Sequence, residues 1–137
     1  MIILDTNVIS ALMRRKPDTI IVDWLDKQPR MSIWTTSITV LEIQFGLQIM
    51  PEGKRQSQLI QSFSAMLDEM GQRVAVFDAA AARQAGDLMA SRKKKGRPVE
   101  LRDTMIAGIA LSHHATLATG NTAHFCDLSV PLIDPWA

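Results

Sequence analysis

Short apolar runs alternate with longer amphipathic segments along this chain, and the alternation predicts strands separated by helices. The expected strands are residues 2–4, 32–35, 74–77 and 116–119, with a last edge strand at 132–133. The expected helices are residues 8–13, 18–27, 37 to about 50, 55–70, 79 to about 94, and one that begins at Asp103 and continues through Leu111.

Residues with strong turn or capping preferences separate these segments. Asp5-Thr6-Asn7 ends the first strand. Ser37 and Asp78 are the expected N-caps of the helices that follow them, and Gly71 ends the helix expected at residues 55–70. Strands that alternate with helices predict an α/β fold, in which a mainly parallel sheet carries helices on both faces. In such folds ligands bind beyond the carboxyl ends of the strands, so candidate chemistry is sought there.

Length and composition narrow the class of protein. A chain of 137 residues predicts one domain, and 47% hydrophobic with 21% charged residues is typical of a soluble globular protein. We find no apolar run near the ~20 residues that cross a bilayer and no basic segment ahead of an apolar N-terminus. The single cysteine, Cys126, excludes an internal disulfide. A cytoplasmic protein without membrane contact is therefore expected.

The charge is unevenly distributed. Residues 92–102 carry a local charge of +5, which leaves −4 on the rest of a chain whose net charge is +1. This basic segment is either a solvated helix end, where cations also suit the helix dipole, or a patch that contacts phosphate groups. Its cations are Arg92, Lys93, Lys94, Lys95, Arg97 and Arg102.

Three acids lie at positions in the sequence from which an α/β fold could bring them into one pocket. Asp5 ends the first strand, where it could also simply cap the next helix. Glu42 lies within an apolar stripe of Ile38, Leu41, Phe45 and Ile49, where an unpaired carboxylate is costly, although an ion pair to an arginine would also explain it. Asp103 begins an apolar helix, as an N-cap or as a partner of the helix dipole would.

Clustered carboxylates repel one another, and a divalent cation removes that cost. Oxygen ligands suit Mg²⁺, with Mn²⁺ as the alternative, rather than Zn²⁺. A water on such an ion is a nucleophile suited to phosphodiester hydrolysis, and the basic segment would then contact a nucleic-acid backbone.

Several motifs together resemble PIN-domain ribonucleases, closest to the VapC-type toxins of bacterial type II toxin–antitoxin pairs and their FitB-like branch. These motifs are Asp5-Thr6-Asn7, Glu42, Arg97-Pro98 ahead of Asp103, and Thr119-Gly120-Asn121-Thr122. The resemblance covers the whole chain, and it implies a three-layer α/β/α PIN domain over residues 1–137 with a sheet of about four to five strands. It also implies a metal-dependent endoribonuclease, with tRNA as the expected target, that forms a homodimer. Its expected inhibitor is a cognate VapB-type antitoxin, with which it would form a larger hetero-oligomer.

The resemblance also implies roles for single residues. Asp5, Glu42 and Asp103 match the metal-binding and catalytic acids, and Asn121 lies where many members carry a fourth acid. Because asparagine adds no charge, this departure puts a second metal ion in doubt. Thr6 and Asn7 are expected to support the first acid by hydrogen bonds, together with Thr119.

Three alternatives remain open at this point. An aspartyl phosphatase also begins with Asp after a first strand, but it needs a second Asp where this chain has Asn7. A phospho-receiver domain needs paired acids early in the chain, and nothing here pairs with Asp5. A PIN-like module that binds without catalysis is the third, and the presence of all three acids argues against it.

Overall fold

The computed structural model describes residues 1–97 and 100–137 and contains a five-stranded, fully parallel sheet. The strand order is β3-β2-β1-β4-β5, so the first strand lies at the centre, as its unbroken apolar sequence predicts. Register is fixed by the pairs Ile2↔Ile33 and Ile2↔Thr116 on the two sides of β1. The strands are β1 (Ile2–Leu4), β2 (Ile33–Thr36), β3 (Val74–Ala75), β4 (Thr116–Ala118) and β5 (Leu132–Ile133).

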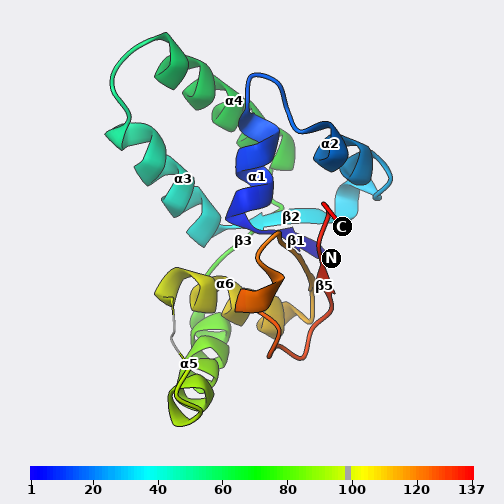
Figure 1. Ribbon diagram of the computed structural model, residues 1–137, viewed down its shortest axis with the longest axis vertical. Helices are drawn as coiled ribbons and strands as arrows, with labels where there is room; N and C mark the ends of the chain where they lie inside the picture. Colours follow the sequence, from blue (N-terminus) through cyan, green and yellow to red (C-terminus); the bar gives the residue numbers. More distant parts are fainter. Residues whose placement is uncertain (98–99) are drawn as a thin grey trace.

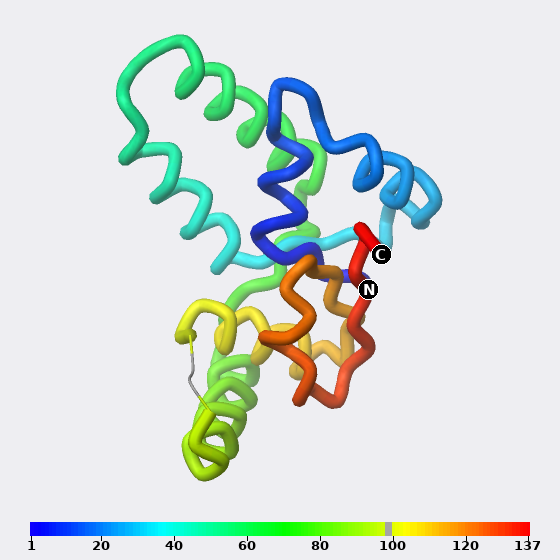
Figure 2. Tube along the Cα trace, in the orientation of Figure 1, coloured from blue at the N-terminus to red at the C-terminus, as the bar shows by residue number. Residues whose placement is uncertain are grey.

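Helices cover both faces of the sheet, which confirms the predicted three-layer arrangement (Figure 1). The first four lie on one side of the sheet and the last two on the other, as the trace in Figure 2 also shows. They are α1 (Thr6–Met13), α2 (Thr19–Asp26), α3 (Ser37–Ile49), α4 (Lys54–Met70), α5 (Ala79–Lys94) and α6 (Leu101–His113). The Arg97-Pro98 motif ends at Pro98, which lies outside the described residues.

Each face of the sheet has its own apolar core. Leu4, Val8 and Ile21 belong to the cluster under α1 to α4, whereas Ile3, Ile106 and Leu117 belong to the cluster under α5 and α6. Helices α5 and α6 pack especially closely, because a Cβ added at Gly108 would lie 2.5 Å from the carbonyl oxygen of Ala81. This packing places the start of α6, with Asp103, beside the end of α5.

The expected N-cap of α3 was assigned to the wrong residue, and the structure excludes the capping alternative for Asp103. Thr36, not Ser37, caps α3, because the Thr36 hydroxyl accepts from the Thr39 N–H at 3.1 Å while the Ser37 hydroxyl accepts from Phe77 N–H. Glu100, not Asp103, caps α6, because its carboxylate accepts the Asp103 N–H at 2.7 Å. The Asp103 side chain is therefore not used for capping.

Three of the four residues in the apolar stripe expected to face the core from α3 face solvent instead. Leu41, Phe45 and Ile49 are 56%, 58% and 67% exposed, and the buried face of α3 is Ile38, Thr39, Ile43 and Leu47. The helix has two apolar faces, and the sheet selects the one that carries Thr39, which hydrogen-bonds to the cap. We therefore infer that Leu41, Phe45 and Ile49 form a surface feature of α3.

Over residues 1–97 and 100–137, the structure contains no helix of the length and apolar character needed to cross a membrane.

Candidate active site

Asp5 is positioned by the end of the central strand. Its main-chain N–H continues the sheet by donating to the Ala118 carbonyl at 2.9 Å, and its carboxylate accepts the Thr6 N–H at 2.8 Å at the start of α1. The residue is only 3% exposed. Burial raises the pKa of the Asp5 carboxyl from 3.8 to about 6, and the negative charges of Asp103 and Glu42 add to the rise.

Side chains from two neighbouring segments hold the Asp5 carboxylate in place. The buried Thr119, one residue after β4, donates its hydroxyl to Asp5 Oδ2 at 2.8 Å and thereby offsets part of the pKa rise. Asn7 donates to the same Oδ2 at 3.4 Å, and its own Oδ1 accepts the Gly120 N–H at 3.2 Å. The carboxylate orientation is therefore set by hydrogen bonds before any ligand arrives.

Glu42 reaches this edge of the sheet from α3. Thr6 donates its hydroxyl to Glu42 Oε1 at 2.9 Å, so that Thr6 supports Glu42 with its side chain and Asp5 with its main chain. The second oxygen, Oε2, lies 3.8 Å from the guanidinium of Arg102. Glu42 is thus part of the same hydrogen-bonded edge as Asp5, and its ion pair is the structural alternative that the sequence left open.

Asp103 contacts a histidine to which the sequence assigned no role. Its Oδ2 lies 2.9 Å from Nδ1 of His124, in the short 3-10 helix Thr122–His124 that follows β4. The position of His124 beyond the carboxyl end of a strand was the only sequence signal that could have found it. His124 remains more than half exposed, so its ring is open to a ligand.

The three acids lie along one edge of the sheet without converging. Among the described residues, no three His, Cys, Asp or Glu side chains are close enough together to hold a metal ion. In this structure Glu42 is turned toward Arg102 and Asp103 toward His124, and the metal-binding roles of the three acids stay predictions. Their chemistry still suits a hard cation, since the donors are oxygens and the buried Asp5 carboxyl is raised in pKa partly by its acidic neighbours.

Asn121 lies beside this edge but is exposed. Its main-chain N–H donates to the Thr119 hydroxyl at 3.0 Å, which places it two residues from the group that holds Asp5. Asn121 therefore lies next to the site in the chain and adds no negative charge there.

The basic segment divides into a buried and an exposed part. Arg92, expected among the RNA contacts, is 4% exposed and pairs with Asp127, with Nε 2.8 Å from Oδ2, so its side chain is not available to RNA. This assignment was wrong because the helix end is covered by the loop after β4. By contrast, Lys93, Lys94 and Lys95 are exposed.

The two remaining cations of the segment have acidic partners at the surface. Arg97 lies 3.6 Å from Asp127, and its guanidinium also donates to the sulfur of Cys126 at 3.6 Å. Arg102 contacts Glu100 at 3.3 Å in addition to Glu42. Because both guanidinium groups are close to half exposed, they can exchange these partners for a phosphate.

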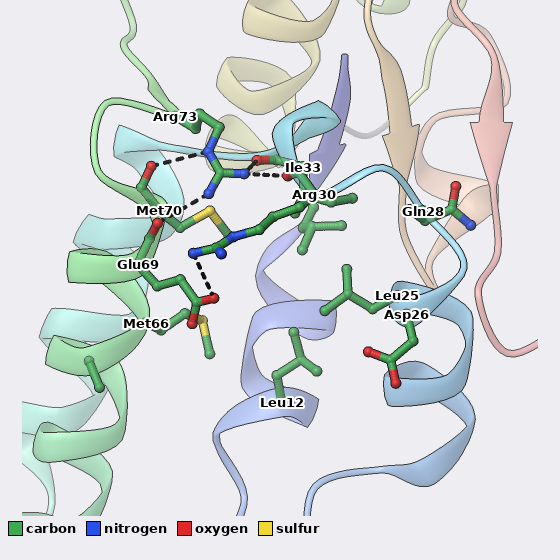
Figure 3. A pocket seen from close by; sticks show the side chains of 12 residues that line it. Leu12, Leu25, Asp26, Gln28, Arg30, Ile33, Met66, Glu69, Met70 and Arg73 are labelled. Atoms are coloured by element: carbon green, nitrogen blue, oxygen red, sulfur yellow. Dashed lines mark hydrogen bonds and ion pairs between the residues drawn. The ribbon is translucent and has the colours of Figure 1, made fainter.

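A separate cavity of about 520 Å³ lies between α1, α2 and α4 (Figure 3). Its walls include Leu12, Leu25 and Met66, and the ion pair between Arg30 and Glu69 lies at its rim. None of the predicted site residues lines it, so the cavity is distinct from the acidic edge.

The fold and the acidic edge together define a PIN-type α/β protein, and comparison with known proteins agrees. The family model described as PIN domain matches residues 2–130, and the chain belongs to this family. VapC ribonuclease Y4jK from Sinorhizobium fredii is 38% identical, with 99% of this chain and 98% of the relative covered. The tRNA(fMet)-specific endonuclease VapC from Shigella flexneri is 32% identical over 89% of this chain and 87% of its own.

Among solved structures, FitAcB from Neisseria gonorrhoeae is similar over 99% of each chain, with 31% identity and a TM-score of 0.90. The similarity thus extends to the whole fold.

Proposed function

We propose that this chain is the toxin component of a type II toxin–antitoxin pair and that it hydrolyses RNA phosphodiester bonds with the help of Mg²⁺ or Mn²⁺. The observation that supports it best is the edge formed by Asp5, Glu42 and Asp103, which lies beyond the carboxyl ends of parallel strands in a chain 38% identical to a VapC ribonuclease. Among the alternatives, a phosphatase would need an acid where this chain has Asn7, and a receiver domain would need an acid paired with Asp5. A PIN-like module that binds without catalysis would not need all three acids.

Asp5, Glu42 and Asp103 would hold the cation, which would supply Lewis acidity and an activated water. Asp5 is already oriented by Thr119 and Thr6, and Glu42 must leave Arg102 to reach the same ion. Asp103 keeps Oδ2 on His124 and would offer its other carboxylate oxygen. Arg102, once released, is close enough to the acids to contact an RNA phosphate.

The decisive experiment incubates the purified protein with labelled RNA in Mg²⁺, in Mn²⁺ and in EDTA. We expect cleavage in both metals, none in EDTA, and none with Asp5→Asn or Asp103→Asn. The matched control is Asp68→Asn, which removes an exposed acid on α4. If EDTA leaves cleavage intact, the metal proposal is wrong, and if no RNA is cut while a phosphomonoester is, the phosphatase alternative replaces it.

We propose tRNA as the first substrate class to test. A relative 32% identical is a tRNA(fMet)-specific endonuclease, and exposed cations on α5 lie beside α6 and its acid Asp103. Total tRNA, ribosomal RNA and messenger RNA should be compared under the same metal conditions. Cleavage confined to one RNA class identifies the target, and uniform cleavage of all classes contradicts the tRNA proposal.

The expected partner is a VapB-type antitoxin, because similar solved structures are toxin–antitoxin complexes. An edge of three carboxylates also favours a partner that presents a cation there. We expect the product of a short neighbouring gene to copurify with this chain and to suppress RNA cleavage, and a complex that retains full activity would contradict the inhibitory role.

We further propose that two copies pair through the exposed apolar stripe Leu41, Phe45 and Ile49 of α3. Apart from Glu42, this helix carries no charge, so two copies can oppose each other without like-charge repulsion. Light scattering should report a dimer for the wild type and a monomer for Phe45→Glu. A wild-type monomer would overturn the homodimer, and the stripe would then be tested as an antitoxin contact with the same variant.

A further inference from the structure

One buried guanidinium connects three segments beside the candidate site. Arg92, near the end of α5, donates from Nε to Asp127 Oδ2 at 2.8 Å and from Nη2 to Asp127 Oδ1 at 2.9 Å. This two-point contact is the strongest geometry available to an arginine and a carboxylate. It raises the pKa of Arg92 and lowers the pKa of Asp127, so both remain charged.

The other donors of Arg92 reach both sides of Asp103. Nη1 donates to the hydroxyl of Thr104, the next residue after Asp103, at 3.1 Å. Nη2 also donates to the main-chain carbonyl of His124 at 2.9 Å, and the ring of His124 contacts Asp103 Oδ2. Arg92 therefore contacts both the side chain of Thr104, which follows Asp103 in the chain, and the backbone of His124, whose ring contacts Asp103.

The segment that carries His124 is held by other contacts as well. It lies in a 3-10 helix of three residues between β4 and β5, and the next residue, Phe125, is fully buried in the core under α5 and α6. Thr104 is also fixed by its hydroxyl, which donates to the Glu100 carbonyl at 2.9 Å within the first turn of α6. Arg92 thus adds a direct link between the backbone of His124 and the start of α6.

We propose that Arg92 is a positioning residue for Asp103: by holding His124 and Thr104 together, it sets the direction of the Asp103 carboxylate. The fork of donors explains why arginine is needed here, since lysine has three donors on one nitrogen and cannot span Asp127, Thr104 and His124 at once. The inference rests on the proposed role of Asp103 in binding the cation.

The test measures Mn²⁺ affinity by calorimetry for the wild type, Arg92→Lys, Asp103→Asn and the control Arg97→Lys. Arg97 contacts the same Asp127 but neither Thr104 nor His124, so the control makes the same exchange of guanidinium for ammonium beside Asp127. We expect Arg92→Lys to weaken Mn²⁺ binding about tenfold, the lower end for residues that orient a metal ligand, and Arg97→Lys to leave it unchanged. In RNA cleavage, kcat should fall with KM unchanged.

The outcomes separate the two proposals. If Asp103→Asn binds Mn²⁺ as the wild type does, the metal role of Asp103 is wrong. If Asp103→Asn weakens binding while Arg92→Lys matches the wild type, the positioning role alone is overturned. Should Arg92→Lys fail to fold, Thr104→Val, which removes one acceptor of the same guanidinium, is judged by the same criterion.

A double-mutant cycle distinguishes positioning from general support of the fold. The cycle compares Mn²⁺ affinity for Arg92→Lys, His124→Asn and the variant that carries both substitutions. If Arg92 acts through His124, the double variant should bind Mn²⁺ as well as whichever single variant has the lower Mn²⁺ affinity. Losses that add in full would mean that the two residues act independently, and they would contradict the proposal.

Discussion

The two sides of the candidate site hold their acids in different ways. On the sheet side, Asp5 is buried and accepts hydrogen bonds from Thr6, Thr119 and Asn7, so its direction is fixed at the cost of desolvation. On the helix side, Asp103 is partly exposed and contacts His124, whose loop is held by Arg92. One acid is thus preorganised by the end of the sheet, whereas the other depends on contacts between a helix start and a loop, to which Arg92 contributes.

The largest effects should come from Asp5→Asn. RNA cleavage should fall by more than about 100-fold, because loss of a ligand exceeds the 10–100-fold cost of losing a residue that only supports one. In EDTA, however, the free energy of unfolding should rise by up to about 3 kcal/mol at pH 7.5, since the charged form of Asp5 is disfavoured by about two pKa units.

The pH dependence of that gain has a definite sign. The folded pKa of Asp5, about 6, lies above the ordinary value of 3.8, so its cost is full above pH 6 and disappears as pH falls toward 3.8. Denaturant unfolding in EDTA should therefore show Asp5→Asn more stable than the wild type at pH 7.5 and equal to it near pH 4. A gap of equal size at both pH values would mean that charge burial is not its cause.

Asp127→Ala should have the next largest effect, now on stability. It leaves the buried Arg92 charge without its carboxylate and should cost about 3 kcal/mol at pH 7. Because the pKa of Asp127 is lowered in the folded state, this contribution is present above its ordinary pKa and is lost as pH falls through the lower folded value.

An exposed ion pair provides the control for that prediction. Glu69→Ala removes the partner of Arg30 at the surface, where both side chains are more than half exposed, and should cost less than about 1 kcal/mol. Chemical denaturation of both variants at pH 7 measures the difference. Equal losses would show that the Arg92–Asp127 pair contributes no more than a surface contact.

The same contrast explains what the sequence could and could not predict. Short apolar runs and caps such as Asp78 depend on neighbours along the chain, so the alternation of strands and helices and the edge containing Asp5 were predictable. The contacts of Arg92 and His124 join residues 32 and 21 positions from their partners, and no local pattern encodes them.

The helix α3 shows a second limit. Its apolar stripe was expected to face the core, but Leu41, Phe45 and Ile49 are exposed because hydrophobic periodicity does not say whether the sheet or another molecule covers a face. Glu42 was singled out because it lies within this stripe, but most of the stripe is exposed. What distinguishes Glu42 in the structure is the hydrogen bond that it accepts from the Thr6 hydroxyl, beside the buried face of α3.

Thr119→Val should give an intermediate effect that compares the two sides directly. It removes the hydroxyl that lowers the pKa of Asp5, so less of the carboxylate is ionised at pH 7. Mn²⁺ binding should therefore weaken, but by less than the roughly tenfold loss expected where the orientation of a ligand is lost. This loss should shrink at pH 8.5, where Asp5 ionises in both proteins. A loss that does not depend on pH would indicate a change in geometry instead, as expected for Arg92→Lys on the helix side.

The smallest effect should come from replacing Lys93, Lys94 and Lys95 with glutamine. If these exposed cations bind RNA, a plot of the logarithm of RNA affinity against the logarithm of salt concentration should become less steep in the variant. The slope should fall by up to about 2, which is roughly 0.7 for each single-strand phosphate that a lysine no longer neutralises. Mn²⁺ affinity should stay unchanged. Replacing Arg14, Arg15 and Lys16 removes three exposed cations that follow α1 and serves as the control.

An unchanged slope, with only a loss of about 0.3–1 kcal/mol in stability, would instead identify the lysines as a solvated end of α5 that favours the helix dipole. Because Arg92 at the same helix end is buried, the two results together would separate the part of the basic segment that supports the site from the part that meets the substrate.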